Sequence, residues 1–384
     1  MTAAVRELRK FVAPECIIGT GARLLAGRYA KNYHAQHVFV VTGPHVKRAG
    51  WVKDVTDSLE AESIAYTVFS KVSPNPRDHE VMEGAALFEE AGCDAIVAIG
   101  GGSPIDCAKG IAIVVSNKKH VLEFEGVDNV PVPPPPMICI PTTAGTGADV
   151  SQFAIINDTT RRVKIAIVSK MIVPDIALVD PLPLTTLPPE LTAHTGMDAI
   201  THSVEAYVSN ASSPITDIHA LESIRLMNAH LPLACATPES VEERYQTMLG
   251  SLFAGLAFSN ASLGAVHAMA HSLGGYSDLP HGECNALLLE HVAEFNYDAC
   301  PERYDTITAL LMPPGSRKTG RDALIHALRT FRESLGITDR LSDLGVKRED
   351  LPMLARKAIR DPCLATNPRK MAVEDIERVY ERAL

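Results

Sequence analysis

The 384-residue chain lacks several features that mark specialised classes of protein. It contains no apolar run of the roughly 20 residues that a membrane span requires, no internal repeat and no low-complexity tail. Its formal net charge is −10 at pH 7, whereas a nucleic-acid partner would favour a basic face. We therefore expect neither a membrane protein nor a nucleic-acid-binding protein.

Its eight cysteines are scattered and form no CxxC pair. The first residues, MTAAVRELRKFVAPECIIG, carry charges but no continuous apolar core or cleavage-like site, so we expect no signal peptide. In an acidic chain without a secretion signal, scattered cysteines indicate reduced thiols that mostly fill the core. A cytoplasmic location is the expectation.

Short β-branched runs alternate with amphipathic stretches in the first half of the chain. Strands are predicted at 37–42, 65–70, 94–100, 137–141, 153–158, 163–169 and 176–180, and helices at 46–62, 76–92 and 103–117. Such alternation implies βαβ units and a parallel sheet. Beyond a proline-rich stretch, Pro181–Pro189, the pattern changes to long helical periodicity. We expect two domains: an α/β, Rossmann-like domain over residues 1–184 and an all-α domain over residues 185–384.

Two turns of small residues follow predicted strands. Gly101, Gly102 and Ser103 lead into a helix whose free N–H groups and dipole suit a phosphate, with Asp106 expected in its first turn to tie the loop backbone. The stretch is neither GxGxxG nor a Walker motif, so a plain tight turn is the alternative. The second turn, PTTAGTG, offers Thr142, Thr143 and Thr146 as donors to phosphate or ribose oxygens. Two such turns favour a ligand, because ligands gather at the carboxyl ends of parallel strands.

Histidines cluster in the second half. His267, His271 and a loop-like His281 fall within fifteen residues, and Asp198 and His202 lie four apart on a predicted helix. A carboxylate with several imidazoles is a ligand set for iron(II) or zinc. Spacing alone favours His267 and His271 as a ligand pair.

The plainer interpretation is that each histidine is a satisfied core residue and that Asp198 is a cap or an ion-pair partner. A zinc peptidase is excluded, because the HExxH motif needs a glutamate where Ala268 stands.

Four motifs together resemble the iron-containing (group III) alcohol dehydrogenases: GGGSPIDCAKG, PTTAGTG, TGMDAITHSVEAYVS and GAVHAMAHSLGGYSDLPHGECNALLLEHV. The resemblance covers nearly the whole chain, in order, and is strongest to propanediol, lactaldehyde and short-chain ethanol dehydrogenases. It implies a dinucleotide-binding first domain, a metal-binding second domain and a homodimer or higher homo-oligomer. The implied reaction is reversible, NAD(P)-linked hydride transfer between a short-chain primary alcohol or diol and its aldehyde.

The resemblance also assigns roles to residues. It implies that Asp198, His202, His267 and His281 bind the metal, iron(II) or alternatively zinc, and that His271 instead lies near the nicotinamide and relays a proton. This overrides the pairing of His267 with His271 that spacing favours. The expected cofactor contacts are Gly43, Asn75, Gly101, Gly102, Ser103, Asp106, Thr142, Thr143, Thr146 and Lys164.

One departure from the family pattern concerns the cofactor. NAD-preferring members often carry an aspartate directly after the strand that ends at Thr42, where it repels a ribose phosphate. This chain has Gly43 there, with Lys47 and Arg48 nearby to attract such a phosphate. NAD is the expected cofactor and NADP the alternative.

Three other functions remain open on the sequence. A zinc-dependent glycerol dehydrogenase or a dehydroquinate-synthase-like lyase would share the fold, and the lyase would need a basic pocket for its substrate. A non-catalytic metal-binding scaffold would bind metal without a dinucleotide.

Overall fold

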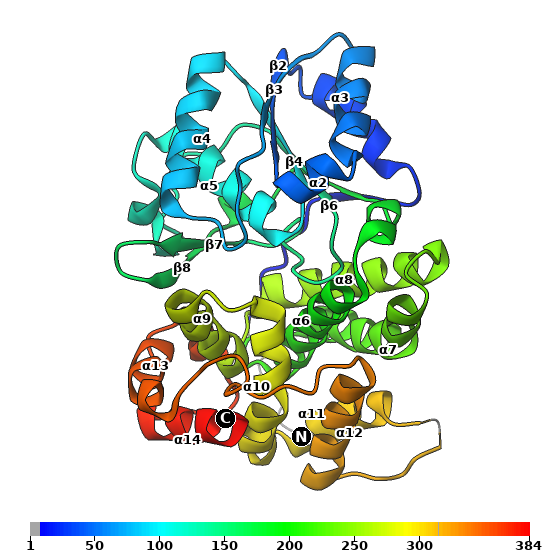
Figure 1. The fold of residues 1–384 in the computed structure, drawn as a ribbon, viewed down its shortest axis with the longest axis vertical. Coiled ribbons are helices and arrows are strands. Elements are labelled where there is room, and N and C mark those ends of the chain that lie inside the picture. Colours follow the sequence, from blue (N-terminus) through cyan, green and yellow to red (C-terminus); the bar gives the residue numbers. More distant parts are fainter. Residues whose placement is uncertain (1–7, 314) are drawn as a thin grey trace.

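The computed structural model describes residues 8–313 and 315–384 of the chain. The expectation of no signal peptide rests partly on residues 1–7, which lie outside the described residues. Figure 1 shows an α/β half above a helical half.

A six-stranded sheet forms the centre of the upper half (Figure 1). Its order is β1 (Glu15–Ile18), β9 (Ile176–Val179), β6 (Met137–Pro141), β4 (Ala95–Gly100), β2 (His37–Thr42) and β3 (Ala65–Phe69). All neighbouring strands are parallel, which confirms the predicted parallel sheet. Strand β1, which the sequence did not predict, forms one edge.

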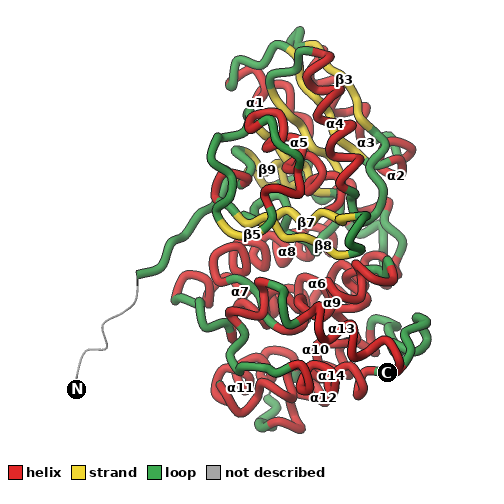
Figure 2. The backbone as a smooth tube through the Cα atoms, turned by 90° about the vertical axis from the view of Figure 1, so that its left-hand side faces the viewer, coloured by secondary structure: helices red, strands yellow, loops and turns green. Residues whose placement is uncertain are grey.

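Helices cover both faces of this sheet (Figures 1 and 2). One face packs against α1 (Ala26–Asn32) and α3 (Trp51–Ala61), and the other against α4 (Asp78–Ala91) and α5 (Gly102–Asn117). Alternate residues of β2 enter the two cores, Val38 and Val40 on one side and Phe39 and Val41 on the other. Burial on both faces is why the central strands are continuous apolar runs rather than alternating ones.

The predicted helix at 46–62 is two helices. A short helix, α2 (Pro44–Arg48), ends before Gly50, and α3 begins at Trp51. Gly50 has φ of 91°, a left-handed conformation that a helix interior does not allow.

Two predicted strands leave the main sheet. β7 (Phe153–Asp158) and β8 (Val163–Val168) form an antiparallel hairpin in a separate three-stranded sheet with β5 (Gly126–Val127). Only four residues connect β7 to β8, whereas a parallel pair needs a crossover of a dozen or more. The hairpin lies at the junction of the two halves, against α9 (Ala265–Ser277) (Figure 2).

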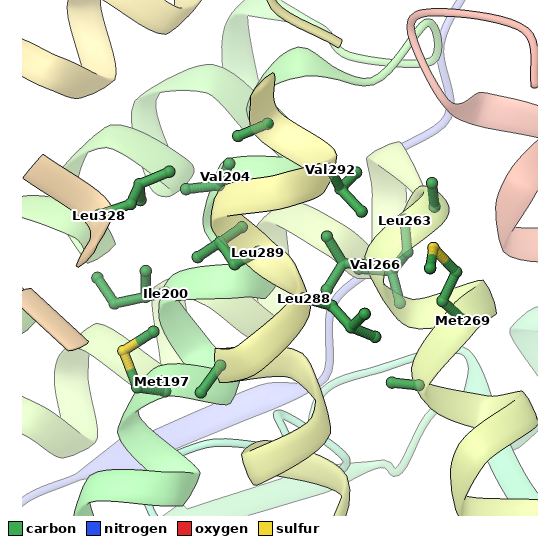
Figure 3. Packing of buried hydrophobic residues seen from close by; sticks show 14 of the residues in the cluster. Met197, Ile200, Val204, Leu263, Val266, Met269, Leu288, Leu289, Val292 and Leu328 are labelled. Atoms are coloured by element: carbon green, nitrogen blue, oxygen red, sulfur yellow. The ribbon is translucent and has the colours of Figure 1, made fainter. Parts of the chain in front are cut away.

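Helices are the only regular secondary structure among the described residues of the lower half, as predicted. It contains α6 (Pro189–Val208), α7 (Pro214–Ala236), α8 (Val241–Ala261), α9, α10 (His281–Asn296), α11 (Pro301–Leu311), α12 (Arg321–Ser334), α13 (Leu351–Ala358) and α14 (Val373–Ala383). Figure 3 shows part of its core, in which Ile200 of α6, Val266 of α9 and Leu289 of α10 are buried. Short 3₁₀ helices connect elements at Ala22–Leu25, Val121–Phe124, Lys170–Ile172, Leu182–Thr186, Tyr297–Ala299, Arg348–Asp350 and Pro362–Thr366.

The turn after β6 presses against the helical half. A side chain at Gly145 would lie 2.4 Å from the Thr195 carbonyl oxygen of α6, and one at Gly147 would lie 2.5 Å from Gly255 Cα of α8. These are distances that a Cβ atom essentially never shows, so only glycine allows this approach. The turn thereby places the α/β half directly on the helix that carries Asp198.

No single described helix is long and apolar enough to cross a membrane. Only α8 and α9 taken together meet that test, and they are bent by 100° with respect to each other.

Candidate metal centre and cofactor cleft

Four predicted metal ligands from three helices converge. Asp198 and His202 come from α6, His267 from α9 and His281 from α10. Asp198 Oδ1 lies 3.6 Å from His202 Nε2, 3.5 Å from His267 Nε2 and 3.7 Å from His281 Nε2. Metal–ligand bonds of about 2.1 Å at tetrahedral angles place ligand atoms about 3.4 Å apart. The distances from Asp198 to the three imidazoles therefore fit ligands of one divalent transition metal.

His281 differs from its sequence-based description as a loop residue. It is the first residue of α10, directly after Pro280. The helix start fixes the direction of the imidazole toward Asp198. It also puts Asn285, four residues later, on the same face.

Asn285 lies within this cluster. Its Nδ2 donates to Asp198 Oδ1 at 2.7 Å and lies 3.2 Å from the Nε2 atoms of His267 and His281. His281 Nδ1 and Asn285 Oδ1 are buried without a partner. Because unpaired buried polar atoms are costly, a further polar partner is expected beside these two atoms. The metal is indicated instead by Asp198 Oδ1 and the Nε2 atoms of His267 and His281, which all lie within 3.2 Å of Asn285 Nδ2.

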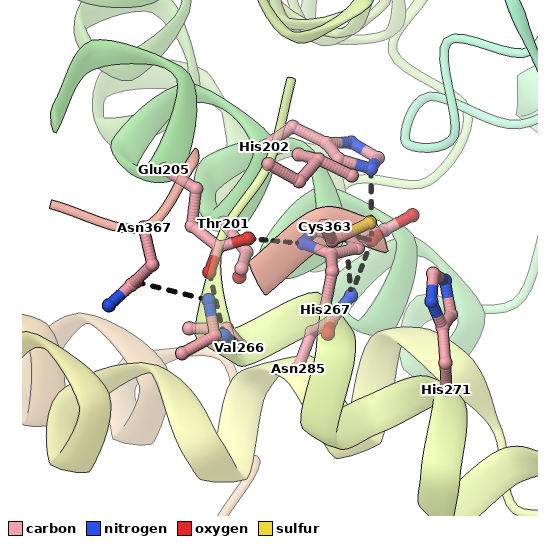
Figure 4. Close-up of polar contacts among 12 residues, drawn as sticks. Thr201, His202, Glu205, Val266, His267, His271, Asn285, Cys363 and Asn367 are labelled. Carbon is pink, nitrogen blue, oxygen red and sulfur yellow. Dashed lines mark hydrogen bonds and ion pairs between the residues drawn. The ribbon is translucent and has the colours of Figure 1, made fainter. Parts of the chain in front are cut away.

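Two of the imidazoles are held by groups behind them. His267 Nδ1 lies 2.6 Å from Glu205 Oε2, and His202 Nδ1 lies 3.2 Å from the Gly145 carbonyl oxygen. Because these oxygens accept, we assign the ring proton to Nδ1, which leaves each Nε2 facing Asp198. Glu205 Oε1 also accepts from the Val266 N–H at 2.6 Å (Figure 4). A carboxylate behind a metal-binding histidine is a common arrangement in metal sites.

Electrostatics in the cluster favour a cation. Although burial opposes ionisation, the imidazoles hold the pKa of Asp198 well below its usual range. Burial lowers the pKa of His202 to about 4, so this ring is neutral at pH 7. His267 differs: burial opposes its charge, but hydrogen bonds to Asp198 and Glu205 raise its pKa to about 9. A metal would therefore displace a proton from His267 on binding.

The cluster opens into a cavity of about 120 Å³ that both halves line. From the α/β half come Gly102, Ser103, Asp106, Thr146, Asn75 and Lys164, and from the helical half come Asp198, His202, His267, His271 and His281. Phe153, Phe258 and Leu263 add apolar walls. Most residues predicted for the cofactor and all those predicted for the metal thus meet in one place.

His271 lines this cavity but faces a different partner. Its ring stacks on His281 with centroids 5.2 Å apart, and its Nδ1 lies 2.9 Å from Asp361 Oδ2. The ligand atoms of Asp198, His267 and His281 lie within 4.8 Å of one another, and neither His202 nor His271 belongs to that group. His202 Nε2 still lies 3.6 Å from Asp198 Oδ1, whereas His271 has Asp361 as its partner. This difference in partners agrees with the division of roles that the family resemblance implies.

The two small-residue turns lie side by side at the carboxyl edge of the sheet. Gly100 of β4 pairs with Pro141 of β6, and a side chain at Gly102 would lie 2.8 Å from Thr146 Cγ2. Helix α5 begins at Gly102 with no side-chain cap, so its first N–H groups are free to bind an anion. Thr143 Oγ1 is buried without a partner, as expected of a hydroxyl that awaits a ligand.

Other predicted cofactor residues lie beside the cavity rather than on it. Thr142 is buried and donates its N–H to the Gly100 carbonyl at 2.9 Å. Gly101, Thr143 and Gly43 also do not line the cavity. Gly43 follows β2 at the same edge of the sheet. A Cβ atom added at Gly43 would lie 3.6 Å from Pro104 Cγ.

Asp106 does not occupy the first turn of α5, as the sequence suggested. It is the fifth residue of that helix, and its side chain lines the cavity instead of tying the loop backbone. The reason is that α5 begins at Gly102, so the first turn is over before Asp106. Burial raises the pKa of Asp106 to about 7.

Asn75 and Lys164 form a contact across the mouth of the cavity. Lys164 Nζ donates to Asn75 Oδ1 at 2.8 Å, and Asn75 Nδ2 donates to Asp278 Oδ1 at 2.8 Å. The Asn75 N–H also donates to Ser103 Oγ at 3.2 Å, so Ser103 accepts here and keeps its own hydrogen for a ligand. Since Asp278 follows α9, this chain of hydrogen bonds joins the two halves.

Three residues of the site were missed from the sequence. Glu205 follows His202 by three residues on α6, and Asn285 follows His281 by four on α10, so helical spacing would have found both. Asp361 is 90 residues from His271, and no local pattern indicates it.

We expect Glu205→Gln to weaken metal affinity by about 10- to 100-fold, because the amide cannot serve both His267 Nδ1–H and the Val266 N–H as acceptor. Competition titration against a chelator would measure this. Glu190→Gln, an exposed site on the same helix, is the matched control. Equal affinity in both variants would contradict a role for Glu205 in holding the metal site.

Comparison with known proteins identifies the family. Residues 13–181 match the model described as iron-containing alcohol dehydrogenase, and residues 192–384 match its C-terminal model. The chain is 37% identical to an NAD-dependent methanol dehydrogenase of Bacillus methanolicus over 97% of its length and 99% of that protein. It is 39% identical to a 1,3-propanediol dehydrogenase of Klebsiella pneumoniae, covering 97% and 96% of the two chains. A crystal structure of a 1,3-propanediol oxidoreductase superposes with a TM-score of 0.95 at 37% identity, covering 98% of this chain and 100% of that one. The chain belongs to the iron-containing alcohol dehydrogenase family.

Proposed function

We propose that the chain interconverts a short-chain primary alcohol or diol with its aldehyde in a metal-dependent reaction linked to NAD. The observation that carries this proposal is the single cavity in which the glycine loop of α5 and the Asp198–histidine cluster meet. A non-catalytic metal-binding scaffold would not need a glycine loop beside its metal site. The relatives named methanol and propanediol dehydrogenases support short primary alcohols as substrates.

The proposed chemistry divides between the bound groups and the chain. Bound iron(II), or zinc in its place, would supply Lewis acidity toward the substrate oxygen, and bound NAD would supply the capacity to accept or return a hydride. Asp198, His202, His267 and His281 hold the metal. Residues Gly101–Ser103 hold the pyrophosphate at the N-terminus of α5, with Thr142, Thr143 and Thr146 beside it.

His271 moves the proton in this proposal. Its Nδ1 is occupied by Asp361, which leaves Nε2 as the nitrogen available to the cavity. Asp361 acts as a positioning residue, because it fixes both the tautomer and the orientation of the ring. Phe153, Phe258 and Leu263 exclude water and leave room for only a small substrate.

The domain boundary and the cellular setting are also proposals. We place the boundary between residues 184 and 185, which is supported by the break between the two family models, at 181 and 192. A homo-oligomer in the cytoplasm is proposed on the family resemblance alone.

The test of the function is a nicotinamide absorbance assay on protein purified without oxygen, with and without added iron(II). We expect metal-dependent turnover of ethanol or propanediol, and of the matching aldehydes in reverse. Absence of turnover with both NAD and NADP, despite tightly bound metal, would contradict the proposal and favour the lyase or the scaffold.

We expect His271→Ala to lower turnover by about 10²- to 10⁴-fold with metal content unchanged, because the proton-transfer group is lost. Asp361→Asn should lower turnover less, at an unchanged Michaelis constant, since the ring remains but its orientation is no longer fixed. The double variant should be no slower than His271→Ala, because the two residues act as one unit. Asp339→Asn, at an exposed position, is the control. Loss of metal from His271→Ala would assign that histidine to the metal instead.

We expect Gly43→Asp to raise the Michaelis constant for NADP by about tenfold or more and to spare NAD, because the new carboxylate repels a ribose phosphate. The backbone tolerates the change, since Gly43 has φ of −98° and an added Cβ meets only ordinary contacts at 3.6 Å. Kinetics with both cofactors would measure the effect. An equal change for NAD and NADP would show that the adenosine ribose lies elsewhere.

A further inference from the structure

A second cluster of metal-ligating side chains lies behind His271. His271 of α9, Asp361 and Cys363 offer ligand atoms that all lie within 4.8 Å of one another. Asp361 Oδ2 lies 2.9 Å from His271 Nδ1, and its Oδ1 accepts from the Cys363 N–H at 2.8 Å. An imidazole, a carboxylate and a thiol, three chemically different donors, therefore lie close together.

We propose that His271 Nδ1, Asp361 and Cys363 form a second metal site, selective for zinc, that is separate from the Asp198 centre. Nitrogen, oxygen and sulfur together form a ligand set that zinc prefers. The Asp198 centre contains no sulfur, so the two sites differ in the metal that they favour. Three protein ligands leave the fourth tetrahedral position to water.

A second cavity lies beside this cluster and is lined by two of its three members, His271 and Asp361. It measures about 470 Å³, and its walls include His271, Asp361, Ser272, Lys357 and Arg360. Arg360 is exposed, so the cavity reaches the surface. An ion can therefore reach His271 and Asp361 from this cavity, whereas Cys363 is buried and does not line it.

Charge balance favours zinc in this buried setting. Asp361 and a Cys363 thiolate together contribute two negative charges, which neutralise Zn²⁺ while His271 binds as a neutral ring. Four cations lie along the cavity, Arg161, Lys164, Lys357 and Arg360, and they would oppose any site with a net positive charge. Arg161 is already paired with Asp158 and Glu125. Burial raises the pKa of the Cys363 thiol, so binding must release its proton, as zinc does with coordinating thiols.

Occupancy of this site has a consequence for catalysis, which rests on the proposed function. Zinc at Nδ1 replaces the His271–Asp361 hydrogen bond and fixes the ring as a ligand. The ring can then no longer relay a proton, so zinc should inhibit the iron-loaded enzyme without displacing its iron.

Cobalt(II) is the probe, because a thiolate bound to cobalt absorbs in the near ultraviolet and the Asp198 centre has no thiolate. Enzyme loaded with one equivalent of iron(II) without oxygen would be titrated with cobalt(II), and iron in the ultrafiltrate would be measured. We expect the band to saturate at one cobalt per chain, with iron retained, and to disappear when zinc is added. Absence of the band in the wild-type protein would overturn the proposal, and this test does not depend on the folding of any variant.

Two matched variants identify the thiol. Cys363→Ala should lose the band, whereas Cys107→Ala, which removes an equally buried thiol from α5, should keep it. A band that survives in Cys363→Ala would also overturn the proposal. Inhibition of turnover by zinc is then measured in the wild type and in Cys363→Ala. If zinc inhibits the wild type and also releases its iron, the inhibition arises at the Asp198 centre and not at the second site.

The absorption band tests the second site even if the protein has no dehydrogenase activity. Failure of the proposed function and failure of the second site are therefore distinguishable.

Discussion

The buried carboxylate of Asp198 is the constraint around which the lower half is arranged. An ionised carboxylate with no partner in the interior would cost far more than a fold of this size can offset. Here three imidazoles and the Asn285 amide surround it, and they come from the three helices α6, α9 and α10. The packing of α6, α9 and α10 in Figure 3 therefore serves a polar centre as well as an apolar core.

The α/β half is held to that centre by close backbone contact. Gly145 lies against α6, and its carbonyl oxygen also fixes the His202 ring, so a single residue couples the cofactor turn to a metal ligand. Asn75 forms a second connection by bonding to Lys164 on one side and Asp278 on the other. Asn75, Lys164 and His202, which these two connections hold, all line the shared cavity. The relative position of cofactor and metal is thus determined by short polar and backbone contacts, which are more specific than apolar burial.

Local patterns predicted much of this from the sequence, and the errors have a common physical origin. The parallel sheet was predictable because apolar strands alternate with helices. The proximity of Asp198 and His202 was predictable because four residues span about one helical turn. The pairing of β7 with β8 was not, since alternation within a strand does not say which strand lies beside it. The break at Gly50 was missed because the apolar period continues across it. Asp361 could not be predicted at all, because its 90-residue separation from His271 is bridged only in the folded chain.

The His271 ring is where these constraints meet, because its two nitrogens serve different surroundings. The ring lines the cofactor cavity, and its Nδ1 lies in a second group of ligands with Asp361 and Cys363. In a dyad of this kind the aspartate can orient the imidazole only while the proton stays on Nδ1. Any cation that replaces that proton converts an orienting contact into a ligand bond and removes the ring from proton transfer. The arrangement that makes His271 suited to moving a proton therefore also makes it open to capture by a metal from behind.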